Sequence, residues 1–315
     1  FIISGGIMGG CAVPGVMATR TLRSPKEKLA TLLTAPFMPC GAKLPVFLLL
    51  IAAFFSENEA QIMFLITLFA WAIALLVSRL LRSTVIKGDP TPFVMELPPY
   101  RMPTLRGVLI HTWERVWHYI KKAGTVILAV SILLWAAMTF PGLPDQQLQL
   151  FETERQAVAT GTVSAEQQAT LLEEIDNREG QVRLRHSVAG RIGTMLEPVS
   201  KLAGFDWRTN IALVGGFAAK EVIVSTFGTA YSLGEVDPEE TESLSSRIAT
   251  DPAWNQFTAL ALIVFVLLYA PCFVTVVTMA KESSWRWAIF STLFNTALGF
   301  GFAVLIFQVG TRFFA

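Results

Sequence analysis

Three cysteines are the side chains of this sequence best suited to chemistry, and each lies in an apolar segment beside residues that interrupt helices. Cys40 follows Pro39 within residues 35–45, where three prolines, a glycine and a lysine stand inside the apolar run of residues 29–55. Because a proline removes a backbone donor and clashes with the preceding turn, we expect the helix to break there. Broken backbone is tolerated at membrane depth only where protein or a water-filled cavity surrounds it. We therefore expect Cys40 to lie at or near a permeation site.

Cys11 and Cys272 have similar surroundings, Cys11 after a glycine pair and Cys272 directly after Pro271. An odd number of cysteines in apolar segments argues against the disulfide framework of a secreted protein. Each cysteine is then either a packed apolar thiol or a thiol that faces a metal ion.

One acid, Glu221, interrupts the apolar stretch of residues 215–228. A carboxylate is costly to bury in a membrane, but on a pathway it would offset the charge of a passing cation. Ser225, four residues on, extends the same polar face. The alternative is an ion pair of Glu221 with Lys43 or Lys220, and we assign both lysines to gating pairs or to snorkelling positions.

Two further residues are candidates for lining a pathway. Met38 carries a soft sulfur, although filling a gap in the packing is the alternative. Asn295 lies in the last apolar segment, where its alternative is binding a neighbouring helix. The histidines fall outside the apolar segments, so we expect no imidazole metal site. The apolar segments hold no Ser/His/Asp grouping and no paired carboxylates, so we expect no enzyme and no catalytic residue.

Composition places the chain in the membrane class. Of 315 residues, 53% are hydrophobic and 16% are charged, and the mean hydropathy is +0.52. A soluble domain is rarely so apolar. No basic patch interleaved with aromatic residues suggests a nucleic-acid partner, and we expect the lipid bilayer to surround the chain. No cleavable signal peptide is visible, and the abrupt apolar opening suggests that the sequence is a fragment or has an internal start.

The apolar runs predict an all-α polytopic membrane protein. Each predicted span has about the 20 residues that a bilayer core requires. By the excess of Lys and Arg on the inside, residues 20–28, residues 79–87 and the turn at Lys281 are expected in the cytoplasm and the acidic loop of residues 234–251 outside. The predicted spans are residues 29–55, 61–81, 123–140, 209–233, 257–281 and 285–307.

The other segments are expected to be shorter or to lie outside the bilayer core. Glycine-rich residues 1–17 predict a half helix or a re-entrant element, and residues 187–204 an interfacial or re-entrant segment. Residues 104–122 have the periodicity of an amphipathic helix lying in the interface. Residues 143–186 predict an extracytoplasmic insertion of two short helices with a turn at residues 160–162.

Two features recur in the same order and indicate an internal repeat. Gly9-Gly10-Cys11-Ala12 is echoed by Gly215-Gly216-Phe217-Ala218, and Met38-Pro39-Cys40 by Ala270-Pro271-Cys272. With the opposite charge signs of the flanking loops, the pattern predicts an inverted pair with the transport site between its halves. We divide the chain into residues 1–81, a first gate-like repeat; residues 82–141, a proline-rich connector, amphipathic helix and central span; residues 142–206, a polar insertion and interfacial segment; and residues 207–315, a second gate-like repeat.

Four motifs, in this order, closely resemble the membrane domain of the bacterial ferrous-iron transporter family FeoB. The resemblance covers nearly the whole chain and implies inward transport of Fe²⁺ across the bacterial inner membrane, with Cys11, Cys40 and Cys272 as gate cysteines. With Glu221, these are our candidate residues for a transient Fe²⁺ pathway. The motifs are residues 10–21, residues 36–45, Gly216-Phe217-Ala218-Ala219-Lys220-Glu221-Val222 and Tyr269-Ala270-Pro271-Cys272.

The sequence departs from that family in one large respect, since it contains no Gly-x-x-x-x-Gly-Lys-Ser/Thr loop to cradle a phosphate. The family implies coupling to a GTP-binding domain, so GTP and Mg²⁺ would act only through a domain missing from this sequence, in cis or in trans. We also expect the small proteins FeoA and FeoC as partners, and a homo-oligomer. Two other functions stay open: transport of a nucleoside or another organic solute, and a membrane scaffold that transports nothing.

Overall fold

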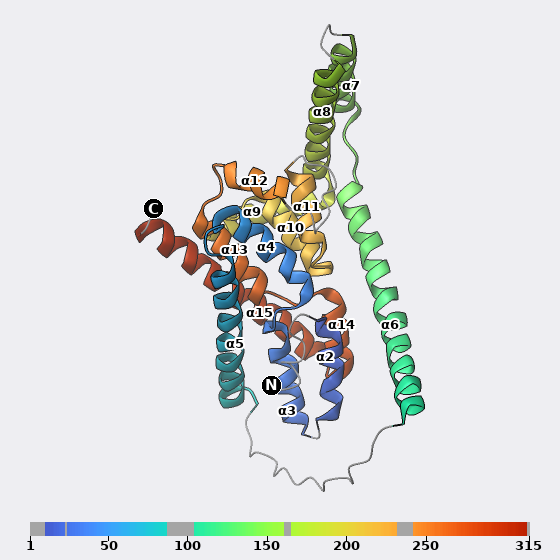
Figure 1. Ribbon diagram of the computed structural model, residues 1–315, viewed down its shortest axis with the longest axis vertical. Helices are drawn as coiled ribbons and strands as arrows, with labels where there is room; N and C mark the ends of the chain where they lie inside the picture. Colours follow the sequence, from blue (N-terminus) through green and yellow to red (C-terminus); the bar gives the residue numbers. More distant parts are fainter. Residues whose placement is uncertain (1–9, 23, 87–103, 161–164, 232–241, 314–315) are drawn as a thin grey trace.

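The computed structural model describes residues 10–22, 24–86, 104–160, 165–231 and 242–313, and within these ranges it contains helices and no strand (Figure 1). The all-α prediction is confirmed. The predicted half helix of residues 1–17 lies partly, and the proline-rich connector of residues 89–103 wholly, outside the described residues. The helices are α2 (Ala12–Ala18), α3 (Pro25–Thr34), α4 (Leu44–Phe54), α5 (Glu59–Thr84), α6 (Leu105–Thr139), α7 (Asp145–Thr160), α8 (Ala165–His186), α9 (Val188–Ser200), α10 (Trp207–Ala218), α11 (Val222–Ala230), α12 (Glu242–Thr250), α13 (Gln256–Leu268), α14 (Phe273–Glu282) and α15 (Trp285–Phe313), with short 3-10 turns between several of them.

Four segments are long and apolar enough to cross a membrane: Pro25–Phe54, Glu59–Thr84, Gln256–Glu282 and Trp285–Phe313. They coincide with four of the six predicted spans, and the chain is a multi-pass membrane protein. These segments differ in how much of their most apolar stretch is buried inside the protein. The buried share is 78% for Gln256–Glu282, against 28% for α5 and 22% for α15. The pair α13 and α14 is therefore central, while α5 and α15 present apolar side chains such as Phe64 and Leu293 to lipid.

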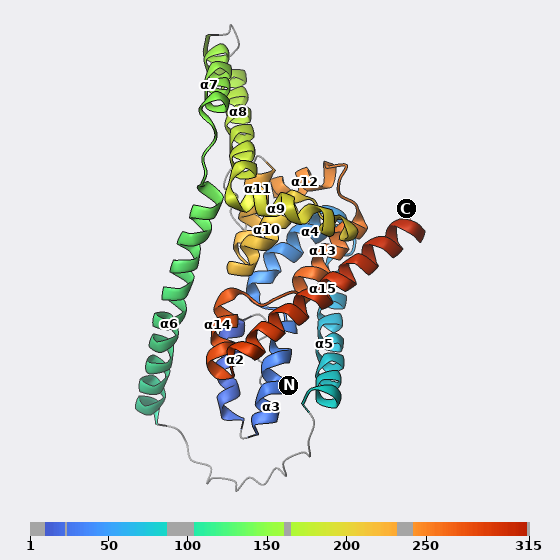
Figure 2. The ribbon, with the colours of Figure 1, turned by 180° about the vertical axis from the view of Figure 1, so that it is seen from behind.

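The first and third spans are each two helices separated by a break, and they run in opposite directions. The end of α4 meets the start of α13, since Gln256 Nε2 donates to Phe54 O at 3.4 Å. At the other end, Arg20 beside α3 pairs with Glu282 at the end of α14. The two broken spans are therefore antiparallel, as an inverted pair would require (Figure 2).

The predicted span of residues 209–233 is wrong, because α10 and α11 form a helical hairpin that enters and leaves at one side. Gln181 of α8 donates to Ala230 O at the end of α11, and Arg185 of α8 stacks on Trp207 at the start of α10. Both ends of the hairpin thus lie against α8, and its tip is at residues 219–221. The two helices approach closely at Gly216, where a Cβ would lie 2.4 Å from Ile223 Cγ1.

The predicted pair of an interfacial helix at residues 104–122 and a span at residues 123–140 is also wrong. A single continuous helix, α6, covers both stretches. Gly124 costs helix stability but does not end a helix by itself, and the chain turns only beyond Thr139.

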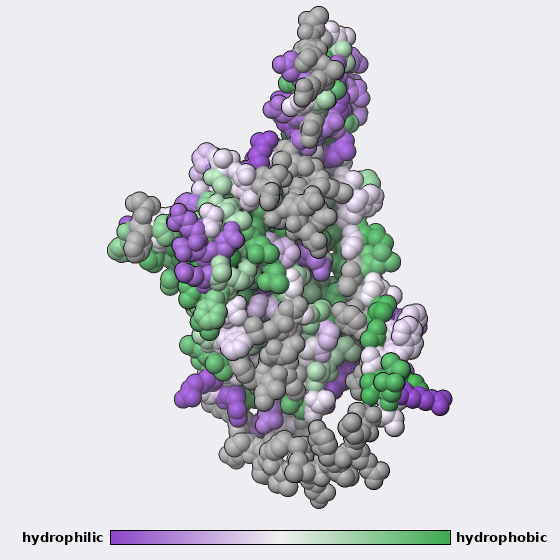
Figure 3. Space-filling model, viewed as in Figure 1, coloured by the Kyte–Doolittle hydropathy of each residue, from purple (hydrophilic) through white to green (hydrophobic). Residues whose placement is uncertain are grey.

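The polar insertion is confirmed as two helices, α7 and α8, which project beyond the bundle as a hydrophilic hairpin (Figure 3). Arg155 of α7 binds Asp176 and Glu179 of α8 at 2.6 and 2.5 Å. The hairpin stands at the opposite end of the molecule from the start of α3 (Figure 1). Its extracytoplasmic position stays a prediction. Most of the predicted turn at residues 160–162 lies outside the described residues.

The segment of residues 187–204 forms α9 and one 3-10 turn that ends at Gly204, whose φ of 77° only glycine adopts readily. Helix α9 packs along α10, where Gly193 lies against Ile211 and Asn210 donates to Gly193 O. Its outer face exposes Met195 and Val199. The segment is therefore a cover on the re-entrant hairpin and not a crossing helix.

Candidate metal pathway at the helix breaks

One cavity of about 360 Å³ lies where four interrupted segments of the chain meet. Residues 10–13 at the start of α2 and the break between α3 and α4 come from the first half. The tip of the α10–α11 hairpin and the break between α13 and α14 come from the second half. The cavity is therefore lined by both halves of the chain, and the inverted repeat itself stays a prediction.

The prolines explain why the two spanning helices stop here. An α-helical carbonyl accepts from the amide four residues on, and Pro271 has no N–H to give to Leu267. Helix α13 accordingly ends at Leu268, and α14 begins at Phe273. In the first half, the backbone passes through short 3-10 turns on either side of Met38-Pro39-Cys40 before α4 begins.

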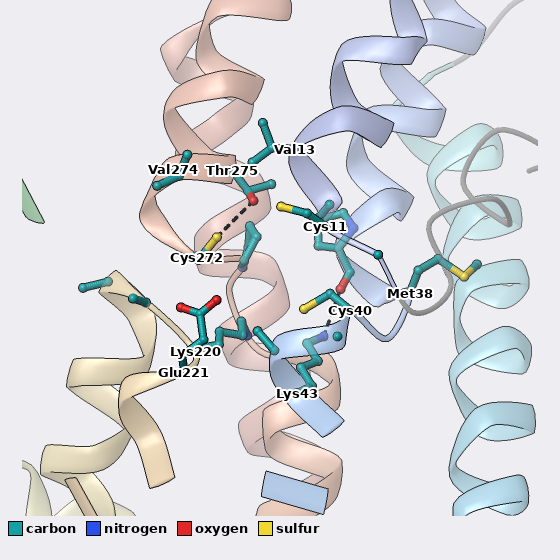
Figure 4. A pocket seen from close by; sticks show the side chains of 18 residues that line it. Cys11, Val13, Met38, Cys40, Lys43, Lys220, Glu221, Cys272, Val274 and Thr275 are labelled. Carbon is teal, nitrogen blue, oxygen red and sulfur yellow. Dashed lines mark hydrogen bonds between the residues drawn. The ribbon is translucent and has the colours of Figure 1, made fainter. Parts of the chain in front are cut away.

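All four predicted ligands line this cavity, and each occupies the residue that precedes a helix. Cys11 is the N-cap of α2, Cys40 of the 3-10 turn Gly41–Lys43, Glu221 of α11 and Cys272 of α14. None of the four side chains caps its helix by a hydrogen bond. Their sulfur and oxygen atoms remain directed toward the common space (Figure 4).

The contacts of these side chains are few. Cys11 and Glu221 are exposed, and Cys40 and Cys272 are partly exposed. The Sγ of Cys272 lies 3.1 Å from the Oγ1 of Thr275 one turn along α14. The alternative pairing of Glu221 with Lys43 or Lys220 is not present, since no ion pair within 4.0 Å joins these described residues.

The two lysines are buried in the cavity wall instead. Lys43 is 2% exposed, and its Nζ donates to Pro36 O at 3.3 Å and to Leu267 O at 2.7 Å. Lys220 is 3% exposed, and its Nζ lies 3.7 Å from the centroid of the Tyr269 ring. This is the geometry of a cation–π contact. Neither lysine snorkels to the membrane surface.

The remaining candidates lie outside the space enclosed by the thiols. Met38 borders the cavity, but its side chain points away from the three cysteines (Figure 4) and is 2% exposed. Ser225 donates to Val222 O at 3.2 Å and does not border the cavity. Asn295 is fully buried on α15, also away from the cavity lining. Their role as pathway lining stays a prediction.

Two residues at the site were not predicted from the sequence: Thr275, which lines the cavity, and Tyr269, which contacts the lining residue Lys220. Thr275 follows Cys272 by three residues, a spacing at which side chains on a helix meet. Tyr269 belongs to the Tyr-Ala-Pro-Cys motif, yet only the fold shows that its ring covers Lys220.

The arrangement is open and does not form a closed metal cage. Within the described part of the chain, no group of three or more His, Cys, Asp or Glu side chains is placed to hold a metal ion together. Ligands from four segments could instead contact an ion in ones or twos. Such weak, divided coordination suits an ion that has to leave again.

Two family profiles match the chain. The profile described as the C terminus of ferrous iron transport protein B covers residues 63–115, and the Gate profile, described as nucleoside recognition, covers residues 120–286. The second spans more than half of the chain. No solved structure matched.

Several curated proteins are similar over nearly the whole chain. A fusion of Fe(2+) transport protein A with the Fe(2+) transporter FeoB from Porphyromonas gingivalis is 38% identical, over 98% of this chain and 37% of its own length. The Fe(2+) transporters FeoB of Helicobacter pylori and Methanocaldococcus jannaschii are 35% and 33% identical, over 95% and 98% of this chain and 46% and 41% of their own lengths. The chain thus spans less than half the length of these relatives. It belongs to the FeoB family and corresponds to the membrane region that contains the Gate and C-terminal sequences.

Proposed function

We propose that the chain forms the pathway by which Fe²⁺ crosses the bacterial inner membrane into the cytoplasm. Cys11, Cys40, Cys272 and Glu221 serve as transient ligands along it. The observation that carries this proposal is the convergence of all four side chains on one cavity lined by both halves of the chain. Similarity to proteins named Fe(2+) transporters supports iron as the cargo.

The donor set suits this ion. Ferrous iron accepts both thiolate and carboxylate ligands, whereas hard cations prefer oxygen alone. Thiolate is the form of cysteine that binds metals. The acid at Glu221 adds charge compensation at the hairpin tip.

Coupling and partners are proposed from the relatives. We infer from the family resemblance that the whole protein includes a GTP-binding domain that works with Mg²⁺, joined to this chain or bound to it. The sequence given contains no phosphate-binding loop of the Gly-Lys-Ser/Thr kind. The fusion in Porphyromonas gingivalis supports FeoA as a partner. FeoC and a homo-oligomer remain expectations from the family resemblance.

The test is uptake of radiolabelled Fe²⁺, kept reduced, by cells or vesicles that carry the whole protein. Cys40→Ser, Cys272→Ser and Glu221→Gln should each lower the initial rate about tenfold or more at limiting iron, the size seen when support of a metal site is lost. Glu57→Gln, an exposed acid in the α4–α5 turn, is the matched control and should transport normally. Uptake that is unchanged in both cysteine variants at equal membrane abundance would refute the pathway and favour the scaffold.

A second candidate, nucleoside transport, is favoured by one observation: the Gate profile that matches residues 120–286 is described as nucleoside recognition. Uptake of radiolabelled nucleoside by the same vesicles separates the two. Iron transport predicts no nucleoside accumulation above that of empty vesicles, while a nucleoside carrier predicts accumulation that is insensitive to the cysteine variants.

A further inference from the structure

The buried amine of Lys43 lies at the point where the two broken helices meet. It donates to one carbonyl from each half, Pro36 O at 3.3 Å and Leu267 O at 2.7 Å. Both bonds are buried, and a buried polar group that loses its partner costs free energy because water does not replace the lost bond. Lys43 is thus a polar tie across the interface of the repeats.

The bond to Leu267 O replaces one that the sequence has removed. In an uninterrupted α13, this carbonyl would accept from the amide of residue 271, which is Pro271. Buried carbonyls are nearly always paired, because an unpaired one loses its bond to water without a substitute. The first half therefore supplies the donor that the second half lacks.

The same tie fixes the thiol-bearing segments relative to one another. Cys40 lies between Pro36 and Lys43, so the bond from Lys43 to Pro36 O closes the loop that carries this cysteine. Next to it, Gly41 N donates to Gly10 O, the carbonyl beside Cys11, at 3.2 Å. Through Leu267 the chain of hydrogen bonds reaches the break that carries Cys272. All three thiol segments are joined in this way.

We propose that Lys43 is the positioning residue of the pathway: it sets the separation of Cys40 and Cys272 by pairing the carbonyl that Pro271 leaves without a donor. The inference rests on the proposed function for its meaning in transport. The geometry itself can be tested without any iron.

The experiment measures cross-linking of Cys40 to Cys272 in the purified whole protein, in a Cys11→Ser background. Bifunctional thiol reagents of increasing span are used, and the linked pair is identified by mass spectrometry. Lys43→Met should lower the rate with the best-fitting reagent about tenfold, the scale of leaving a buried carbonyl unpaired. Lys43→Arg, which keeps a hydrogen-bond donor, should recover most of that rate. Lys26→Met, on the exposed face of α3, should leave it unchanged.

Pro271→Ala provides the decisive comparison, because it returns an amide to residue 271 and gives Leu267 O a partner within its own helix. In that background, Lys43→Met should change the cross-linking rate less than twofold, a loss of coupling that a general packing defect would not produce. Lys43→Gln is measured in parallel in case the methionine variant does not fold. Unchanged cross-linking in a folded Lys43→Met or Lys43→Gln protein, or the same loss with and without Pro271, would overturn the proposal.

The outcome is separable from that of the proposed function. If cross-linking depends on Lys43 while iron uptake does not depend on the cysteines, the positioning role stands and the iron pathway fails. If uptake needs the cysteines but cross-linking ignores Lys43, the pathway stands and this inference fails.

Discussion

The contact between Arg20 and Glu282 joins residues 262 positions apart in the sequence and offers a quantitative test of how the two halves are held together. Arg20 Nε lies 2.8 Å from both carboxylate oxygens, and Nη2 adds a further contact. The Glu282 side chain is only 4% exposed, whereas that of Arg20 is 53% exposed. Lys28 adds one longer contact of 3.5 Å. Helices α2 and α14 also share a small apolar cluster around Val13 and Val274.

Replacing Arg20 with methionine should destabilise the folded protein by about 1.5–2 kcal/mol. Hydrogen bonds to charged groups contribute roughly 1.5–3 kcal/mol, and the exposure of Arg20 places the expected loss near the lower end of that range. Lys28→Met should cost about 0.5 kcal/mol or less, because its single contact is long.

The assay is reversible unfolding in mixed detergent micelles, followed by far-ultraviolet circular dichroism. It is run as a double-mutant cycle on Arg20→Met and Glu282→Gln. We expect the two changes to couple by about 1 kcal/mol or more, as residues in direct contact do. High salt should weaken this coupling only partly, because the carboxylate is shielded from solvent. A coupling below about 0.3 kcal/mol, the scatter expected for independent sites, would refute the reasoning.

Three further outcomes follow from the packing. Gly216→Ala should lower the free energy of unfolding by about 1–3 kcal/mol, because the new Cβ would overlap Ile223. Gly215→Ala should cost less, because its Cβ would lie 3.4 Å from the nearest side-chain atom, and thermal unfolding of the purified variants compares the two. Arg155→Ala should increase hydrogen exchange in α7 and α8 by removing their shared ion pairs, yet leave iron uptake unchanged, and a loss of uptake at normal abundance would show that the hairpin takes part in transport. Met38→Leu should retain uptake, since the thioether points away from the cysteines; a loss as large as that of Cys40→Ser would place the sulfur on the pathway.

Local chemistry made the helix breaks predictable. A proline has no backbone N–H to donate to a helix. The positions of Pro39 and Pro271 in the sequence were therefore enough to predict the interruptions beside Cys40 and Cys272. The echo of one proline–cysteine pair by the other then pointed to two halves and a shared site. Both expectations agree with the observed cavity lining.

The path of the chain between these breaks was less predictable. Residues 209–233 form an apolar stretch long enough to cross a membrane. Hydropathy alone does not predict that the chain turns back at residues 219–221. The hairpin is stabilised by the close approach at Gly216 and by contacts with α8, which are tertiary features. The tie from Lys43 to Leu267 was hidden for the same reason, because it joins residues 224 positions apart.

The four candidate ligands have a common mechanical property. Since Cys11, Cys40, Glu221 and Cys272 each stand directly before a separate helix or helical turn, a tilt of one segment carries its ligand with it. On the proposed pathway, a motion that opens a passage on either side would therefore also separate the donor atoms, and the ion would be released without a separate rearrangement of side chains. Access to the site and affinity for the ion would then change together.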